Sequence, residues 1–202
     1  MPDTTHVLVI GAGAAGSASI RELAQHEEIT TTAIIDTETT PYNRTLINKA
    51  VATGLLEPHH AHLPALPAPP VRDRVQAVDP QEQTVHLRTG ARVDYDALIV
   101  ATGSAPRALP PSIASPAALE SGRVTHLHSL DDALRVRGVL DRTPSPRVLI
   151  YGAGFIGAET AGILRDAGCR VTLAASSPIP GATAFGSQVA GQLSQEIGRA
   201  HV

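Results

Sequence analysis

The chain of 202 residues lacks the features that would crosslink it, anchor it in a membrane or attach it to nucleic acid. Its single cysteine, Cys169, excludes both an internal disulfide framework and the redox cysteine pair of a dithiol enzyme. No apolar run approaches the roughly 18 residues of a membrane span, and the N-terminus has no pattern of a signal peptide. The net charge of -3 gives no basic surface for nucleic acid. We therefore expect a cytoplasmic protein without membrane or nucleic-acid partners.

Aromatic side chains are also scarce: they make up 2% of the residues, and tryptophan is absent. The core must therefore be built from valine, leucine, isoleucine and alanine, and the hydrophobic content of 43% is ordinary for a globular protein. His59, His60 and His62 lie close together, but no further cluster of cysteine, histidine or carboxylate lies nearby at ligand spacing. We expect a solvated loop at these histidines and no metal site.

The sequence does contain one glycine motif in two copies. Gly-x-Gly-x-x-Gly spans residues 11–16 and returns at residues 152–157, each time after a short apolar run and before a helix-like stretch. The apolar run predicts a buried parallel strand. In such a motif the first glycine permits the tight turn, the second lets a pyrophosphate approach the backbone, and the third packs the helix on the strand. The helix N-terminus then faces the phosphates, so two copies predict a protein that binds two dinucleotides.

The remaining pattern predicts an α/β protein with a Rossmann-like parallel sheet, a small antiparallel β insertion and a partial second Rossmann unit. Residues 41–56 are expected to turn into a helix, residues 57–70 to form a surface loop and residues 104–123 to bridge two domains. The expected strands cover residues 7–11, 31–36, 74–78, 84–88, 92–95, 96–103, 124–128, 147–152 and 170–174. The expected helices cover residues 14–26, 130–140 and 155–167.

Two acidic residues have specific expected roles. Asp36 lies 20 residues after Gly16, where this fold places a carboxylate against a ribose hydroxyl; the alternative is a solvated aspartate at a strand end. Asp132 lies three residues after Ser129, which predicts a capping box for the following helix, with aspartate in place of the usual glutamate or glutamine.

Five segments, in the same order, resemble those of the FAD-dependent pyridine nucleotide-disulfide oxidoreductase superfamily, in particular its ferredoxin reductase-like branch. They are residues 11–16, 41–49, 96–104, 130–133 and 152–159. The resemblance implies FAD at the first glycine motif, NAD(P)H at the second, and hydride transfer from NAD(P)H to FAD. It further implies that electrons pass to a small redox protein such as a ferredoxin, and that the full-length enzyme can be a homodimer.

The resemblance also implies particular site residues. Lys49 and Glu159 would form a catalytic ion pair near the flavin, where a charged lysine favours the reduced ring. The alternative is a surface lysine and a glutamate in the first turn of a helix. The FAD-binding residues would be Gly11, Gly13, Ala14, Ala15, Gly16, Asp36, Arg44, Lys49, Val75, Ala101, Thr102 and Gly103. The residues of the nicotinamide site would be Gly152, Gly154, Phe155, Ile156, Gly157 and Glu159.

The chain departs from the family pattern in several places. His128 stands where the family often has arginine, and residues 173–177 carry no ribose-binding acid, which leaves NADH and NADPH both open. Residues 196–202 do not continue the family helix and match the translation of a common sequencing adaptor, so we expect a non-native tail after a truncated reading frame. The expected domains are an incomplete FAD-binding domain over residues 1–123 and the start of an NAD(P)-binding domain over residues 124–195. A chain cut there is expected to be inactive alone.

Other functions stay open on the sequence alone. Among enzymes, a flavoprotein NAD(P)H oxidase, a rubredoxin reductase and the flavoprotein region of a nitrite reductase are the alternatives. A non-catalytic nucleotide-binding module is the alternative from another class. Lys49 and Glu159 argue against this module, because a pure binding protein needs no charged pair at a flavin.

Overall fold

The computed structural model describes residues 4–175, residue 179 and residues 181–197. The described chain forms two compact units. Unit 1 consists of the described residues up to Arg44 together with His59–Ala108, and unit 2 consists of Thr45–Pro58 together with the described residues from Leu109 onward. The predicted domains, with boundaries at residues 123 and 195, concern cofactor binding and stay predictions. Within the described ranges, no helix is long and apolar enough to cross a lipid bilayer.

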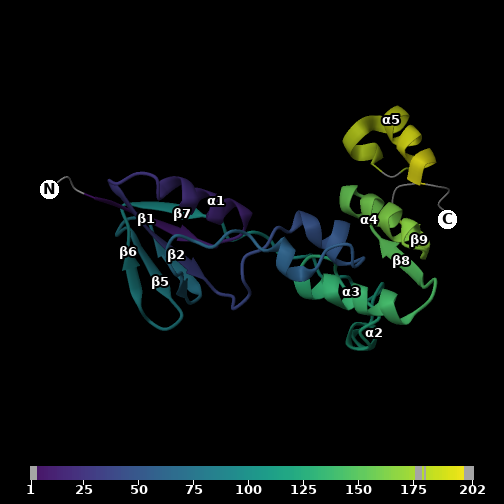
Figure 1. The fold of residues 1–202 in the computed structure, drawn as a ribbon, viewed down its shortest axis with the longest axis horizontal. Coiled ribbons are helices and arrows are strands. Elements are labelled where there is room, and N and C mark those ends of the chain that lie inside the picture. Colours follow the sequence, from purple (N-terminus) through teal and green to yellow (C-terminus); the bar gives the residue numbers. More distant parts are fainter. Residues whose placement is uncertain (1–3, 176–178, 180, 198–202) are drawn as a thin grey trace. The chain divides into compact units, whose positions relative to one another are not determined.

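A four-stranded parallel sheet is the first layer of unit 1 (Figure 1). Its strands are β1 (Thr5–Ile10), β2 (Ile29–Ile35), β3 (Val71–Arg72) and β7 (Ala97–Val100), in the order β3-β2-β1-β7. Ile10 at the end of β1 pairs with Ile34 of β2 and with Val100 of β7, so the carboxyl ends of three strands meet at one edge. Leu8 and Val9 in the central strand β1 are fully buried, which explains the apolar run in the sequence.

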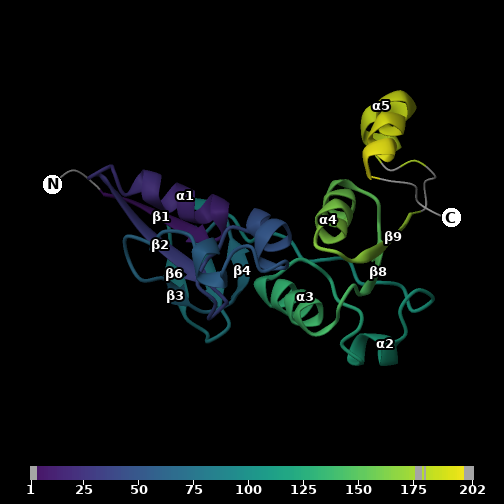
Figure 2. The ribbon, with the colours of Figure 1, turned by 45° about the vertical axis from the view of Figure 1, so that its right-hand side comes forward.

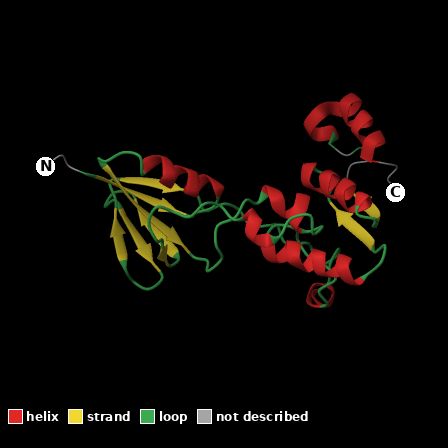
Figure 3. Ribbon diagram, viewed as in Figure 1, coloured by secondary structure: helices red, strands yellow, loops and turns green. Residues whose placement is uncertain are grey.

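Both faces of this sheet are covered (Figure 3). Helix α1 (Ala14–Leu23) lies on one face, where the core consists of Val7, Val9, Ile20 and Ala33. A small antiparallel sheet of β4 (Val75–Asp79), β5 (Thr84–Leu87) and β6 (Arg92–Asp94) lies on the other. The core on this side consists of Leu8, Ile10, Ile34, Val85, Leu87 and Tyr95. Because successive strand residues point to opposite faces, β1 supplies both halves of the core. The predicted parallel sheet with its antiparallel insertion is confirmed.

Unit 2 contains the second strand–turn–helix copy (Figure 2). Strands β8 (Arg147–Tyr151) and β9 (Arg170–Ala174) form a two-stranded parallel sheet and are joined by α4 (Phe155–Asp166), which packs on both. The remaining elements of unit 2 are the π-helical turn η1 (Ile47–Val51), α2 (Pro116–Glu120), α3 (Leu130–Arg142) and α5 (Ala182–Ile197). A 3-10 turn, η2 (Pro58–Ala61), lies where the chain returns to unit 1. Leu149 and Tyr151 of β8 are exposed, because α4 covers the other face of this small sheet.

The strand predicted over residues 124–128 is wrong, because this segment has no regular secondary structure. Its polar groups form hydrogen bonds with the start of α3 instead of with a neighbouring strand. The Thr125 hydroxyl donates to Oδ1 of Asp132 at 3.3 Å, and the His128 N–H donates to Oδ2 of the same carboxylate at 3.1 Å. The His128 N–H that binds Asp132 cannot at the same time donate to a neighbouring strand.

Three further segments differ in detail from the prediction. The helix expected within residues 41–56 is short and wide: in η1 the Ala52 N–H donates to the Ile47 carbonyl, five residues back, at 2.8 Å. The bridging segment 104–123 contains the short helix α2, whose N-terminus is capped by the Ser115 hydroxyl. Of the predicted tail, Glu196 and Ile197 belong to α5, and residues 198–202 lie outside the described residues.

Candidate functional site

The first glycine turn joins β1 to α1 at the carboxyl edge of the unit 1 sheet. Gly11 has a φ of +94°, a conformation that other residues rarely adopt. A Cβ atom on Gly11 would lie 2.3 Å from the carbonyl oxygen of Ala101. The first glycine motif therefore packs directly on the Ala101-Thr102-Gly103 segment that follows β7. Sequence reasoning predicted a cofactor role for both segments, but it did not predict that they touch.

The other two glycines of this turn have opposite surroundings. A Cβ atom on Gly16 would lie 1.9 Å from the Gly11 carbonyl oxygen, whereas a Cβ on Gly13 would have no atom within 4 Å. Gly13 is also the N-cap of α1, where no side chain accepts a hydrogen bond from the helix. The first intrahelical bond comes from the Ser17 N–H, so the N–H groups of Ala14, Ala15 and Gly16 have no intrahelical acceptor. Open space beside three such donors fits a pyrophosphate.

Asp36 lies at the same edge of the sheet, one residue beyond the end of β2, and is exposed. It lines an open polar cleft of about 230 Å³. The other lining residues are Ile35, Glu38, Arg72, Asp73, Arg74 and Arg88. Arg72 is held in this cleft by the Thr37 carbonyl at 2.6 Å and by Glu38 at 3.3 Å. An exposed carboxylate in this position can accept hydrogen bonds from a ribose, as predicted for Asp36.

Asp73 is the buried acid of the cleft and is tied to its neighbours. The Thr89 hydroxyl donates to its carboxylate and lowers its pKa; burial opposes this effect, and the N–H groups of Arg74 and Thr89 and the Arg88 guanidinium lower the pKa further. The lowered pKa keeps Asp73 ionised at neutral pH, and its hydrogen-bonding capacity is already used within the chain.

Two more predicted FAD-binding residues lie in unit 1 at other places. Val75 is the first residue of β4 and pairs with Leu87, so its backbone belongs to the antiparallel sheet. The Arg44 guanidinium lies 5.9 Å from the centroid of the Tyr42 ring, within the range of a cation–π contact. The structure does not bring either residue to the glycine turn, and their roles at the cofactor stay predictions.

The second glycine turn in unit 2 repeats the geometry of the first. Gly152 has a φ of +112°, a Cβ on Gly157 would lie 1.8 Å from the Gly152 carbonyl oxygen, and a Cβ on Gly154 would have no atom within 4 Å. Gly154 is the N-cap of α4 and, like Gly13, has no side-chain cap. Phe155 and Ile156 begin the helix and are exposed, and the Phe155 ring packs edge-on against Phe185 of α5, with 5.0 Å between centroids.

Lys49 and Glu159, the predicted catalytic pair, form an ion pair within unit 2. The Lys49 Nζ atom lies 3.1 Å from Oε1 of Glu159, and both side chains are about half exposed, at 49% and 42%. Sequence reasoning missed a third member: the Asn48 side-chain amide donates to Oε2 of Glu159 at 3.0 Å. An asparagine beside the predicted lysine was visible in the sequence, but nothing there showed that both side chains reach one carboxylate.

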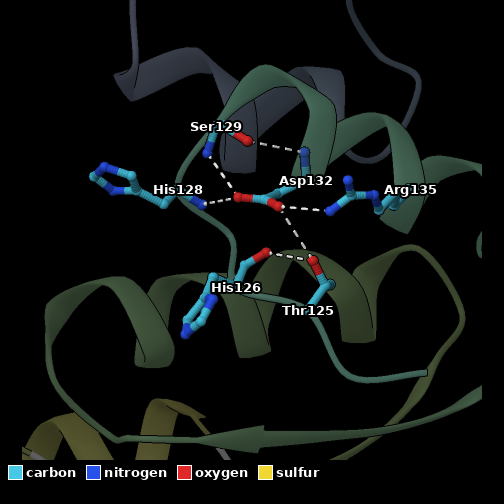
Figure 4. A network of polar contacts seen from close by, with 6 residues as sticks. All are labelled: Thr125, His126, His128, Ser129, Asp132 and Arg135. Atoms are coloured by element: carbon cyan, nitrogen blue, oxygen red, sulfur yellow. Dashed lines mark hydrogen bonds and ion pairs between the residues drawn. The ribbon is translucent and has the colours of Figure 1, made fainter. Parts of the chain in front are cut away.

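The start of α3 holds a further polar network of unit 2, with Asp132 at its centre (Figure 4). Ser129 and Asp132 form the predicted capping box, which is confirmed. Burial raises the pKa of Asp132, but hydrogen bonds from Ser129, the His128 N–H and the Thr125 hydroxyl outweigh this effect and lower the pKa overall. The His128 ring extends away from the carboxylate, so the network holds His128 through its backbone.

The structure also describes the single cysteine and the histidine cluster of the sequence. Cys169 is buried, and burial raises the pKa of its thiol, so it stays a neutral thiol. No three histidine, cysteine, aspartate or glutamate side chains among the described residues are grouped to hold a metal ion. The rings of His59 and His60 lie 3.9 Å apart in η2.

One strand–turn–helix cradle in each unit, both with open space at the middle glycine, defines a protein class that binds two dinucleotides on Rossmann-like folds. The chain belongs to the pyridine nucleotide-disulphide oxidoreductase family, whose model matches residues 5–202.

Several proteins that the chain is similar to are named as reductases of ferredoxins or of similar small redox proteins. The chain is 32% identical to the ferredoxin–NAD(+) reductase subunit of the benzene 1,2-dioxygenase system of Pseudomonas putida, over 83% of this chain and 41% of that protein. It is 30% identical to rhodocoxin reductase of Rhodococcus erythropolis, over 93% of this chain and 44% of that protein. The crystal structure of the covalent putidaredoxin reductase–putidaredoxin complex matches with a TM-score of 0.83 at 25% identity, over 96% of this chain and 47% of that chain. The chain thus spans somewhat less than half the length of these relatives.

Proposed function

We propose that this chain carries the FAD-binding region and the beginning of the nicotinamide-binding region of an NAD(P)H-dependent oxidoreductase that reduces a ferredoxin-like protein. The observation that carries the proposal is the duplicated cradle together with the Lys49–Glu159 ion pair. The names of the relatives support it, because they are reductases of ferredoxin-like proteins. FAD, when bound, supplies a ring that takes up a hydride from NAD(P)H and releases its electrons to an acceptor.

Unit 1 is the proposed FAD-binding part. The N–H groups at the start of α1 would bind the pyrophosphate over the open side of Gly13, and Asp36 would accept hydrogen bonds from the adenosine ribose. Ala101 and Thr102 would border the same cofactor, since they pack on Gly11, and Gly103 follows them directly in the chain. Arg44 and Val75 complete the proposed set by resemblance.

Unit 2 is the proposed nicotinamide-dinucleotide part. The N–H groups of Phe155, Ile156 and Gly157 have no intrahelical acceptor and would bind the pyrophosphate beside Gly154. Lys49 would supply positive charge that favours the reduced flavin ring, and Glu159 would keep this charge in place. The sequence at the end of β9 has no acid to select NADH, so both nicotinamide cofactors belong in the test.

A cytoplasmic location and a homodimer of the full-length enzyme complete the proposal. Cell fractionation tests the location, and light scattering on the full-length protein tests the dimer.

The deciding experiment measures FAD binding and reduction. FAD is titrated onto a purified full-length version of the protein, because the chain alone is expected to be inactive, and NADH or NADPH is added without oxygen while the flavin absorbance is followed. The proposal expects FAD to bind and to be bleached, and Lys49→Met to slow the bleaching several-fold without lowering the FAD content. Arg165→Met is the matched control, because it removes an exposed cation that is paired with Asp166 on α4. Failure of FAD to bind, or bound FAD that NAD(P)H does not reduce, would refute the proposal.

The acceptor needs a separate measurement. Reduced flavin is offered a ferredoxin-like protein, a rubredoxin or oxygen, and the rate of reoxidation is compared. Fastest reoxidation by the ferredoxin-like protein is the expected result, whereas a preference for rubredoxin or oxygen would reassign the acceptor to one of the alternatives.

A further inference from the structure

The carboxylate of Glu159 is bound at both of its oxygens by two consecutive residues of η1. Lys49 contacts Oε1 at 3.1 Å, and the Asn48 amide donates to Oε2 at 3.0 Å. The two donors differ in environment, because Asn48 is 7% exposed while the Lys49 side chain is 49% exposed. Lys49 is also the only lysine of the chain. One oxygen is therefore held by a buried neutral donor and the other by the only ammonium side chain.

Asn48 and Lys49 are consecutive residues of the π-helical turn η1. In an α-helix, residues i and i+1 point in directions about 100° apart and do not face the same partner. The hydrogen bonds of η1 are wider: the Ala52 N–H donates to the Ile47 carbonyl, and the Leu55 N–H donates to the Ala50 carbonyl at 2.9 Å. Such turns occur mostly as single insertions and frequently at functional sites.

The chemistry of the Asn48 amide suits this contact. An ionised carboxylate only accepts hydrogen bonds, so the nitrogen of the amide must face Glu159. The amide carries no charge and does not titrate. It therefore holds Oε2 without competing with Lys49 for the negative charge, which a second cation at this place would do.

We infer that Asn48 is a positioning residue: it fixes the Glu159 carboxylate so that Oε1 stays on Lys49 and the ammonium keeps one direction. The action of this ammonium on a flavin rests on the proposed function, but the positioning itself does not. A glutamate without the amide contact would rotate freely, and Lys49 would share its time between the carboxylate and water.

The test uses the fact that the chain has two kinds of amine, Lys49 and the N-terminus. The chain is treated with limiting acetic anhydride, and mass spectrometry compares acetylation of Lys49 with that of the N-terminal amine. A paired ammonium reacts slowly. Replacing the amide by an apolar group of similar size in Asn48→Leu should raise the relative rate by about two- to fivefold, the range that matches measured couplings of exposed ion pairs. Glu159→Gln removes the pair and gives the upper reference.

Thr53→Val is the matched control, because its hydroxyl lies in the same segment and donates to the Ala50 carbonyl instead of Glu159. It should leave the Lys49 rate at the native value. An Asn48→Leu rate equal to the native rate would overturn the inference.

A second measurement needs no substitution of Asn48. NMR spectra of the native chain give the reference positions of the Asn48 side-chain amide resonances. These resonances should shift in Glu159→Gln and keep their positions in Arg165→Met. Asn48 amide resonances that do not shift in Glu159→Gln would also overturn the inference. Flavin reduction in Lys49→Met decides the proposed function separately, so either claim can fail while the other stands.

Discussion

Gly13 and Gly16 lie three residues apart in one turn, yet a methyl group would meet different surroundings at each. At Gly16 it would collide with the Gly11 carbonyl oxygen at 1.9 Å, which is backbone and cannot move aside cheaply. At Gly13 it would meet no atom, and the backbone there, with φ at -64° and ψ at -167°, is one that alanine adopts readily. Gly16 is therefore required by packing within the chain. Gly13 is required only if a ligand occupies the open space beside it.

We therefore expect Gly16→Ala to destabilise the ligand-free chain by about 1–3 kcal/mol, as overpacked sites do. Gly13→Ala should leave its stability unchanged or slightly higher, because alanine restricts the unfolded chain more than glycine does. Thermal unfolding without FAD measures both. Equal losses at the two positions would show that the turn has no spare room at Gly13.

Two buried hydroxyl groups give a second comparison at single residues. Ser17 in α1 donates to the Ala12 carbonyl at 2.6 Å, whereas Thr160 in α4 is 6% exposed and its Oγ1 has no hydrogen-bond partner among the described residues. An unsatisfied buried polar group costs about 1–3 kcal/mol. Thr160→Val, which keeps the shape, should thus raise the free energy of unfolding by about 1 kcal/mol. Ser17→Ala should lower it, and denaturant unfolding of both variants measures the difference. A Thr160→Val chain that unfolds more easily would mean that the hydroxyl has a partner after all.

The residue scale also shows where sequence reasoning stops. The pairing of Glu159 with Lys49 could be predicted because the family resemblance implies it, and the two side chains form an ion pair at 3.1 Å. Asn48 could not be predicted in the same way. Asn48 lies in a π-helical turn, and an extra residue in one turn leaves no periodic pattern from which to predict the turn.

At the scale of elements, patterns within a few neighbouring residues correctly predicted single strands and a helix start. The apolar runs before each glycine motif became β1 and β8, and Ser129 with Asp132 became the capping box of α3. The strand predicted over residues 124–128 was wrong, because a β-prone pattern forms a strand only where a partner strand is present. Asp132 takes up the polar groups of Thr125 and His128 instead, and this competition is visible only once the segment and the helix start are placed together (Figure 4).

The same carboxylate makes the stability of the chain depend on pH. The pKa of Asp132 is lower in the folded chain than its ordinary value of 3.8. Its hydrogen bonds therefore stabilise the fold fully at pH values above 3.8, and this contribution is lost as the pH falls below that value toward the folded pKa. Asp132→Asn should unfold at a lower temperature than the native chain at neutral pH, and the difference should shrink below pH 3.8. Asp131→Asn, an exposed carboxylate of the same turn, is the control. A difference that is constant with pH would contradict the role of the charge.

At the scale of the whole molecule, the chain contains the same strand–turn–helix motif twice. The parallel sheet, its antiparallel insertion and the second cradle could be predicted, because each follows from a run of neighbouring residues. The path of the chain could not. Residues 45–58 belong to unit 2 although unit 1 precedes and follows them, and this depends on tertiary contacts, such as the 2.8 Å ion pair between Arg137 of α3 and Glu57. Lys49 thus lies in the unit of the second cradle, which no local pattern indicated.

If the two cradles hold two different dinucleotides, damage to one should leave the other intact. Gly13→Ala and Gly154→Ala are a matched pair, because each adds a methyl group to open space at the N-cap of a helix. Gly13→Ala should weaken FAD binding by about tenfold or more, since a loss of 1.4 kcal/mol already corresponds to tenfold, and should leave NADH binding unchanged. Gly154→Ala should do the reverse. Calorimetric titration of each variant with each ligand gives four affinities. Loss of both ligands in either variant would mean that the cradles do not act as separate sites, and loss of neither would mean that the space beside these glycines is not where the phosphates bind.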